Sequence, residues 1–169
     1  SILVLFSLGI TKGKWGSLLT ALLDFKKDYD ANARLAVVMP ELVASTGASY
    51  ARMGLRDLAD AMFDHYCTSG QLDALAAAYA TLPQAQMIPR AAYHKLVRDE
   101  VELIGLDAMP GRVAGTGIVP YPPGIPMIMP GEAVGPAEGP YLTYLRTLRA
   151  WDRRFPGFAH DTHGVEMED

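Results

Sequence analysis

Residues 111–132 read GRVAGTGIVPYPPGIPMIMPGE, and their composition differs from everything around them. Between Met109 and Pro140 lie eight of the chain's twelve prolines and seven of its glycines. Apolar residues stand among them, at positions 113, 118, 119, 125, 127, 128 and 129. A disordered linker would lack such apolar residues, and proline is tolerated in turns and at strand edges. We therefore expect short buried strands joined by proline-fixed turns.

Helices are predicted on both sides of this stretch. After it, Tyr141, Leu142, Leu145, Leu148 and Trp151 line one helical face, and Pro156-Gly157 should end that helix. Before it, residues 35–99 look largely helical, and Pro40 and Pro89 should each begin a helix. Three inward stripes are predicted there: 55, 58, 59, 62, 63 and 66; then 72, 75, 76, 79 and 82; then 92, 93, 96 and 97. Residues 101–106 are predicted to form a strand. The fold class expected is α+β.

The N-terminal segment predicts a strand followed by a helix. Residues 2–8 are a short apolar run typical of a buried strand. Residues 14–30 follow as an amphipathic helix, with Thr11 or Ser17 near its start. Its apolar residues fall mostly on one stripe: Trp15, Leu18, Leu19, Leu22, Leu23, Phe25 and Tyr29. This is half of a βαβ unit, and the chain opens without a methionine, so we expect a piece of a larger protein.

Composition excludes several classes of protein. The chain has 169 residues, of which half are hydrophobic and a fifth charged, which is ordinary for a globular protein. A net charge of -4 argues against a non-specific nucleic-acid binder. The apolar run 2–10 is too short to span a membrane. Cys67 is the only cysteine, which fits a reducing cytoplasm.

The cluster of His160, Asp161 and His163 has the composition of a metal site. The spacing of the two histidines would suit two ligands on one helix, but Pro156-Gly157 has just ended the preceding helix. A polar surface turn is the favoured interpretation, and no metal site is expected.

Lys95 follows His94 and is the lysine that most invites a catalytic interpretation. A lysine forms a Schiff base only after losing its proton, which needs burial or a cationic neighbour. The predicted inward face of this helix is taken by its apolar residues, so Lys95 should lie in solvent. A catalytic role is therefore not expected.

Glu132 and Arg112 are the polar residues of the proline-rich stretch that invite a functional interpretation. Glu132 follows Pro130-Gly131 and either orients a ligand or caps its own turn. Arg112 is expected to meet a carboxylate at an interface or, more boldly, a substrate. The glycines at 111, 115 and 117 lack the strand-to-helix context of a phosphate loop. The residues alone support a soluble α+β module without a self-contained active site.

The proline-rich stretch resembles the C-terminal domain of the bacterial pyridoxal-phosphate-dependent ornithine/lysine/arginine decarboxylases. The resemblance rests on Gly111-Arg112-Val113-Ala114, on IVPYPPGIP at 118–126 and on Met129-Pro130-Gly131-Glu132. It continues in LFSLGITKGKWG at 5–16, MPEL at 39–42, MGLRDL at 53–58 and FPGF at 155–158. It covers nearly the whole chain. The GKWG stretch and Trp151-Asp152 look most like the arginine-specific, acid-induced branch of the family.

The resemblance implies a division of the chain and a missing catalytic centre. Residues 1–30 would be the end of an aminotransferase-like small domain, and residues 31–169 the C-terminal domain. The family's cofactor lysine stands in a Ser-x-x-His-Lys motif of the large domain, and no such motif occurs here. None of the five lysines (12, 14, 26, 27 and 95) is expected to bind pyridoxal phosphate. The chain alone should have no catalytic or cofactor-binding residue and should be inactive.

The resemblance also implies what the parent protein does. It would convert arginine into agmatine and CO2, in the cytoplasm, as part of acid resistance. The chain would shape the active-site channel and support assembly with the rest of its polypeptide and neighbouring subunits, with Glu132, Arg112 and Tyr121 near that channel or the interfaces. The alternatives are a lysine or ornithine decarboxylase segment, or a non-catalytic assembly or regulatory module. Arg34 as the remnant of a nucleotide site is disfavoured, and the isolated chain is expected to self-associate.

Overall fold

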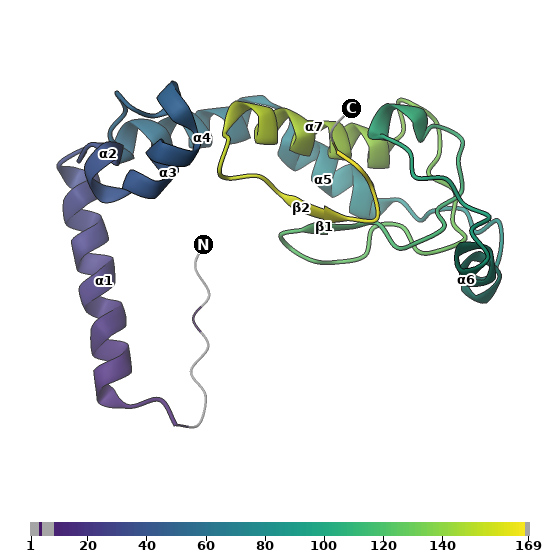
Figure 1. Ribbon diagram of the computed structural model, residues 1–169, viewed down its shortest axis with the longest axis horizontal. Helices are drawn as coiled ribbons and strands as arrows, with labels where there is room; N and C mark the ends of the chain where they lie inside the picture. The colour runs from purple at the N-terminus through teal and green to yellow at the C-terminus, as the bar shows by residue number, and fades with distance from the viewer. Residues whose placement is uncertain (1–3, 5–8, 168–169) are drawn as a thin grey trace. The chain divides into compact units, whose positions relative to one another are not determined.

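A computed structural model of the chain describes residue 4 and residues 9–167, except for the side chain of Ala48 (Figure 1). The predicted strand 2–8 lies outside the described residues, apart from residue 4. The chain divides into two compact units, Ser1–Ala61 and Met62–Asp169, and each is described by itself.

The first unit is helical. Its elements are α1 (Lys12–Asp30), α2 (Leu35–Val38), α3 (Pro40–Ser45), the 3₁₀ turn η1 (Gly47–Ser49) and the start of α4 (Leu55–Thr68). Pro40 begins α3, as predicted. Thr11 is the N-cap of α1, but its side chain makes no capping hydrogen bond. Helix α1 buries no residue, and Trp15 and Phe25 are about half exposed. The predicted apolar stripe therefore exists without a cover in the described part of this unit.

Asn32 lies in the turn after α1 and connects it to the start of α4. It has a left-handed backbone (φ 47°), a conformation that asparagine tolerates better than most residues. Its Oδ1 accepts hydrogen bonds from the backbone N–H of Arg56 (3.0 Å) and Asp57 (3.2 Å). Its Nδ2 donates to the Asp57 carboxylate at 2.9 Å. Asn32 thus caps the first turn of α4 from a distant position in the sequence.

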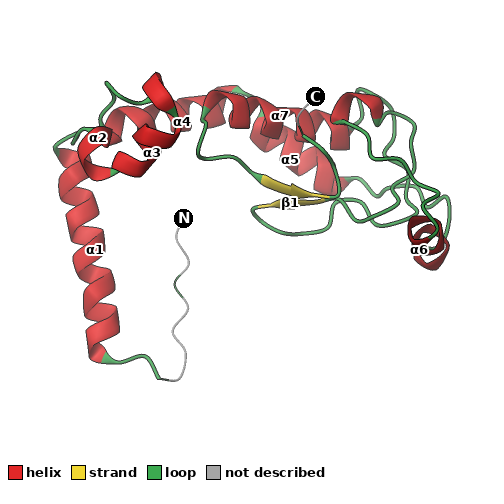
Figure 2. Cartoon of the chain, in the orientation of Figure 1, coloured by secondary structure: helices red, strands yellow, loops and turns green. Residues whose placement is uncertain are grey.

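The second unit is α+β, as predicted. Its elements are the C-terminal half of α4, α5 (Gln71–Ala80), α6 (Pro89–Val97), η2 (Leu106–Ala108), β1 (Val119–Tyr121), α7 (Pro140–Arg154) and β2 (Asp161–His163). Helices α5 and α7 lie side by side (Figures 1 and 2). Five residues of α7 are buried: Tyr141, Leu142, Tyr144, Leu145 and Leu148. They form one core with Ala74 and Ala78 of α5 and with Leu106, Met109, Ile118, Ile128 and Val134.

The proline-rich stretch forms short paired segments, which confirms the main expectation for it. Strand β1 pairs antiparallel with β2, with Val119 opposite His163 and Tyr121 opposite Asp161. Isolated bridges join Ile118 to Ile128 and Val113 to Ala133. Ile118 and Ile128 are buried, whereas Val113, at 39% exposed, is not. Only some of the apolar residues of the proline-rich stretch therefore belong to the core.

Three predictions of inward-facing residues in this unit are wrong in part. Leu72 and Leu82 were expected inward, but they are 47% and 91% exposed, because the small side chains of Ala74 and Ala78 face α7 instead. Small residues such as alanine let two helices approach closely, whereas a hydrophobic pattern in the sequence selects leucine as the inward residue. On α6 only Ala92 is buried. Phe63 of α4 is 69% exposed, against expectation.

Residues 101–106 do not form the predicted strand. Residues 101–104 belong to no helix or strand, Gly105 makes a single parallel bridge to Glu166, and Leu106 begins η2. A short, largely apolar run is compatible with a strand, but a strand also needs a hydrogen-bonded neighbour, and the described residues supply none beyond the bridge at Gly105.

Candidate functional site

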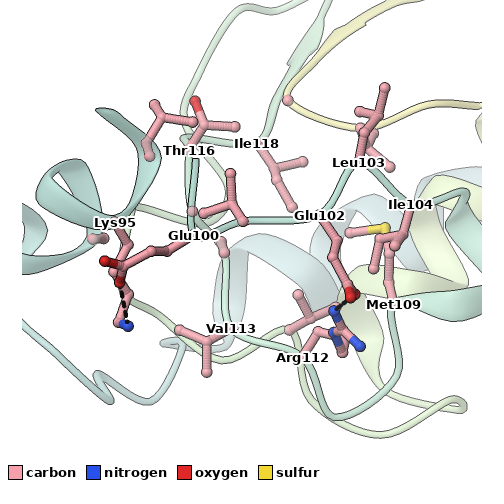
Figure 3. Close-up of a pocket in the computed structure, with 18 of the residues that line it drawn as sticks. Lys95, Glu100, Glu102, Leu103, Ile104, Met109, Arg112, Val113, Thr116 and Ile118 are labelled. Carbon is pink, nitrogen blue, oxygen red and sulfur yellow. Dashed lines mark hydrogen bonds and ion pairs between the residues drawn. The ribbon is translucent and has the colours of Figure 1, made fainter. Parts of the chain in front are cut away.

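A cavity of about 750 Å³ lies in the second unit, between α6, residues 99–104 and the start of the proline-rich stretch (Figure 3). Its apolar wall includes Ala92, Met109, Ala114, Ile118 and Val134, each at most 9% exposed. These wall residues belong to the core of the unit or lie next to it, so the cavity reaches the packed interior.

Two ion pairs lie at this cavity (Figure 3). Lys95 Nζ is 3.2 Å from a carboxylate oxygen of Glu100. Arg112 makes a short contact with Glu102. All four side chains are about half exposed or more, so each pair contributes little to stability. Both cations of the cavity lining, Lys95 and Arg112, therefore already have a carboxylate partner.

Arg112 is the one candidate of the three that lines this cavity. The carboxylate it meets is Glu102 of its own chain, ten residues away. Its backbone also takes part in the fold, since the carbonyl of Arg112 accepts from the Val134 N–H at 2.9 Å.

Glu132 holds its own turn. Its Oε2 accepts a hydrogen bond from the Met129 N–H at 2.7 Å, across Pro130 and Gly131. Its backbone carbonyl accepts from the Ala114 N–H at 2.9 Å. Burial, and then the charge of Glu132, raise the pKa of Tyr141. Glu132 is thus a turn residue in the described structure, and its carboxylate lies near α7.

Tyr121 ends β1 and is 58% exposed. The glycine at 124 approaches its ring so closely that a Cβ there would lie 2.9 Å from a ring carbon. Tyr121 and Glu132 do not line the cavity that Arg112 lines. The three candidates therefore do not converge on one pocket of the described residues.

Residues 160–163 were predicted to form a polar surface turn, but Asp161–His163 form strand β2 and His160 is partly interior. His160 Nδ1 lies 2.8 Å from Asp152, and the side chain of His160 is 13% exposed. His163 is solvated and lies 3.5 Å from Asp161. Among the residues described, no three His, Cys, Asp or Glu side chains are grouped as a metal site. His160 belongs instead to a cluster of rings around Trp151.

This ring cluster also contains His65, which no local sequence pattern marks. The imidazole of His65 lies 5.8 Å from the Trp151 ring and 5.5 Å from the Phe155 ring, measured between centroids. Its Nε2 is buried and has no hydrogen-bond partner among the described residues. Burial first, and the positive charge of Arg154 second, lower the pKa of His65.

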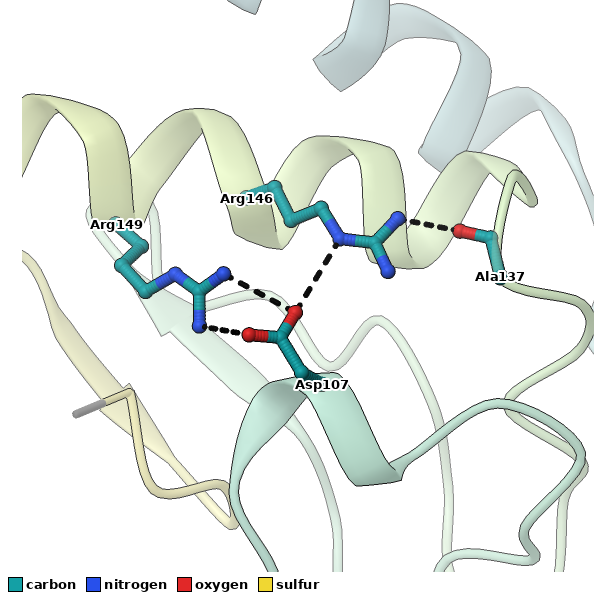
Figure 4. A network of polar contacts seen from close by, with 4 residues as sticks. All are labelled: Asp107, Ala137, Arg146 and Arg149. Carbon is teal, nitrogen blue, oxygen red and sulfur yellow. Dashed lines mark hydrogen bonds and ion pairs between the residues drawn. The ribbon is translucent and has the colours of Figure 1, made fainter. Parts of the chain in front are cut away.

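A carboxylate between two arginines was likewise missed (Figure 4). Arg149 donates to both oxygens of Asp107, at 2.8 and 3.1 Å, and Arg146 Nε lies 3.7 Å from the same carboxylate. Arg146 also donates to the carbonyl of Ala137. These contacts, with Arg149 first, lower the pKa of Asp107. The three-residue spacing of Arg146 and Arg149 on one helix was the available signal.

The lysines do not fit the attachment of pyridoxal phosphate. Lys26 pairs with Asp30 and is 68% exposed, and Lys95 pairs with Glu100. Lys12, Lys14 and Lys27 lie exposed on α1. A lysine that forms a Schiff base needs desolvation or a cationic neighbour, and the described surroundings of these lysines are solvated.

Comparison with known proteins identifies the domain. The family "Orn/Lys/Arg decarboxylase, C-terminal domain" matches residues 72–169. A biodegradative arginine decarboxylase of Escherichia coli is 48% identical over 99% of this chain and 22% of its own length. A lysine decarboxylase of Pseudomonas aeruginosa is also 48% identical, over the whole chain and 22% of its own length. This chain therefore spans under a quarter of the length of these relatives.

Solved structures agree with this match. The constitutive lysine decarboxylase of E. coli has a TM-score of 0.89 at 36% identity, over 98% of this chain and 23% of that one. Lysine decarboxylase A of P. aeruginosa has a TM-score of 0.87 at 48% identity, over 98% and 22%. No helix in the described residues is long and apolar enough to cross a membrane. The family resemblance and the α+β class are thus confirmed, and the chain belongs to the Orn/Lys/Arg decarboxylase C-terminal domain family.

Proposed function

We propose that this chain is the C-terminal part of a cytoplasmic, pyridoxal-phosphate-dependent decarboxylase that converts arginine into agmatine and CO2. The observation that carries the proposal is the family match over residues 72–169, together with 48% identity to a biodegradative arginine decarboxylase. Lysine is the second candidate substrate, because a lysine decarboxylase is equally identical. An inducible ornithine decarboxylase is less similar, at 34% identity. Each decarboxylation consumes a proton, so the parent would serve acid resistance.

The chain's own contribution is support, and the rest of the polypeptide supplies the cofactor lysine. In this proposal residues 1–30 end an aminotransferase-like small domain, and residues 31–169 form the C-terminal domain. The apolar stripe of α1, which no described residue of its unit buries, supports the first assignment because such a stripe needs a partner surface. The family match over residues 72–169 supports the second assignment. The solvated surroundings of Lys26 and Lys95 support placing the cofactor lysine in the rest of the polypeptide.

Glu132, Arg112 and Tyr121 lie near the active-site channel or a subunit interface in this proposal. Tyr121 and Arg112 are exposed enough to meet another surface. Glu132 holds the turn after Met129, so its charge sits on a rigid support. In the full-length enzyme, Glu132→Gln keeps an oxygen that accepts from Met129 and removes the charge. We expect a lower kcat/KM or altered assembly, and no change in the exposed control Glu138→Gln. Unchanged kinetics and assembly in Glu132→Gln would remove this role.

The substrate is tested on the full-length enzyme with arginine, lysine and ornithine at equal concentrations. We expect the highest kcat/KM with arginine, measured as CO2 release, and agmatine as the product identified by mass spectrometry. A higher value with lysine would replace arginine by the second candidate. The 169-residue chain mixed with pyridoxal phosphate should show neither a bound-cofactor absorbance band nor CO2 release.

A further inference from the structure

The C-terminal end of α4, residues 62–68, is held to the second unit by few contacts. The leucines that α4 buries both lie in its first half. Between residues 62 and 68, ring contacts with α7 come from His65 and Tyr66, whose centroids lie 5.8 and 6.1 Å from that of Trp151. A segment with few buried side chains opens at a low cost in free energy. The ring contacts of His65 are therefore a substantial part of what holds this helix end.

The packed position of His65 does not suit a second proton. Its Nε2 is buried and has no hydrogen-bond partner among the described residues. A neutral imidazole carries one N–H and one lone pair, whereas the protonated ring carries two N–H donors and a full positive charge. In the packed position Nε2 would then be an unpaired, buried donor of a charged group, which is costly. Protonation therefore favours a conformation in which the imidazole lies in water.

The charged groups of α7 and of the loop after it do not offset this cost. Arg154 opposes a positive charge on His65, and together with burial, which is the larger cause, it lowers the pKa of His65. Asp152, the carboxylate of the ring cluster, is engaged by His160, whose backbone N–H and Nδ1 both lie 2.8 Å from its Oδ1. The titratable neighbours of His65 that lie at the surface of α4 are Asp64 and Cys67.

His160 lies in the same ring cluster but has the opposite surroundings. Its ring is 5.9 Å from that of Trp151, and the side chains of His160 and Asp152 are only 13% and 18% exposed. An imidazolium at position 160 would face a carboxylate, and a hydrogen bond between two charged groups is stronger than one between neutral groups. The loop after α7 should therefore stay closed in acid, so the effect of acid is confined to the side of the cluster that His65 forms.

We propose that residues 62–68 form an acid-sensitive latch of the second unit: with His65 neutral they pack on Trp151 and Phe155, and protonation of His65 releases them. The released imidazole titrates near its ordinary pKa of 6.5, and the packed one at a lower pKa. The released state is therefore favoured increasingly as the pH falls from 6.5 to the packed value, by at most about tenfold per pH unit. The latch involves no ligand, so it does not depend on the substrate of the parent protein.

Hydrogen exchange followed by mass spectrometry in the full-length protein tests this proposal. The protection of the amides of residues 63–68 is compared at pH 7 and pH 5.5, after correction for the chemical exchange rate at each pH. We expect this protection to be several-fold lower at pH 5.5, and at most about tenfold lower. The amides of residues 144–148, in the buried part of α7, should keep their protection and serve as the internal reference. The absence of a selective loss at residues 63–68 overturns the proposal.

Two variants separate His65 from a general effect of acid. His65→Phe keeps a ring and takes up no proton, so its protection should persist at pH 5.5, whereas the exposed control His94→Phe should lose it as the unmodified protein does. If residues 144–148 of His65→Phe are unprotected at pH 7, His65→Gln takes its place. An equal loss in the His65 variant and the unmodified protein overturns the proposal. Greater protection at pH 5.5 also overturns it, because the attraction between an imidazolium and the Trp151 ring would then outweigh burial.

Discussion

Helices α1 and α7 show how differently the two units are stabilised. Both carry an apolar stripe, and α1 is the longer, at 19 residues against 15. Helix α7 buries five residues in the core of its unit, whereas α1 buries none. The first unit is organised instead around Asn32 and a few buried leucines, including Leu35 and Leu58.

An apolar stripe on a helix therefore predicts that another surface packs against it. It does not predict that this surface belongs to the same unit. Burying a leucine side chain contributes about 1.5–3 kcal/mol, and isolated helices are marginal in water. The stripe of α1 lacks this contribution in the described residues of its unit, so α1 should be the less stable of the two helices in this chain. Four predictions test that contrast.

The largest effect is expected from truncation of a buried leucine in α7. Leu145 is fully buried, so Leu145→Ala should lower the free energy of unfolding by about 2–5 kcal/mol. Leu22→Ala in α1 removes the same atoms from a side chain that is 44% exposed, and should cost about 0.5 kcal/mol or less. Urea denaturation followed by circular dichroism measures both. Equal losses would show that α1 is packed as firmly as α7.

The second prediction concerns two glycines of the first unit. A Cβ on Gly54 would lie 2.0 Å from the side-chain oxygen of Asn32 and 2.6 Å from its carbonyl oxygen, so Gly54→Ala should cost about 1–3 kcal/mol. Gly16 lies within α1 and has no atom near its Cβ position, so Gly16→Ala should be neutral or stabilise by about 0.5–1 kcal/mol. Thermal melting measures both, and a harmless Gly54→Ala would remove Asn32 as the organising residue.

The third prediction concerns His65 of the second unit, which is partly buried and whose Nε2 is buried. Because the pKa of His65 is lowered from 6.5 in the folded state, the unfolded chain takes up a proton first as the pH falls. Stability should therefore fall below pH 6.5 until the folded pKa is reached. His65→Phe should reduce this loss, while the exposed control His94→Phe should keep it. The measurement is the urea midpoint between pH 7 and pH 5, and an unchanged slope in His65→Phe would rule out this role.

The smallest effects are expected at one exposed carboxylate in each unit. The pKa of Asp57 is lowered first by the Gly54 N–H and then by Asn32, and that of Asp107 first by Arg149. Their contribution is present above the unfolded value near 3.8 and is lost as the pH falls through the lower folded value. Asp57→Asn and Asp107→Asn should each weaken the acid dependence of melting. If either variant melts with the same pH dependence as the unmodified chain, the assigned contacts are contradicted.

Local rules predicted the helix limits well. Pro40, Pro89 and the Pro156-Gly157 pair act on the backbone next to them, so their effect does not depend on the rest of the fold. The face of α7 was also predictable, because its large apolar residues are the ones that pack. The face of α5 was predicted only in part. Leu75 and Tyr79 pack against the core as expected, but the buried positions are Ala74 and Ala78, whose small size gives no hydrophobic signal.

The candidate site was predictable only in part. The sequence pointed to Arg112, Glu132 and Tyr121, but their spacing did not show that Arg112 alone lines a cavity and that Glu132 bonds its own turn. Their place near a channel or interface remains a prediction. His65 and Asp107 lie far in sequence from Trp151 and Arg149, so no local pattern brings them together.

Motifs and chemistry local to the backbone were enough to predict the family, the α+β class and the helix limits that prolines set. The buried faces and the ion pairs follow only from the folded arrangement. Those properties depend on contacts between residues far apart in the chain. For α1, the described residues of its own unit bury none of its side chains, so the stripe was predictable and its partner surface was not.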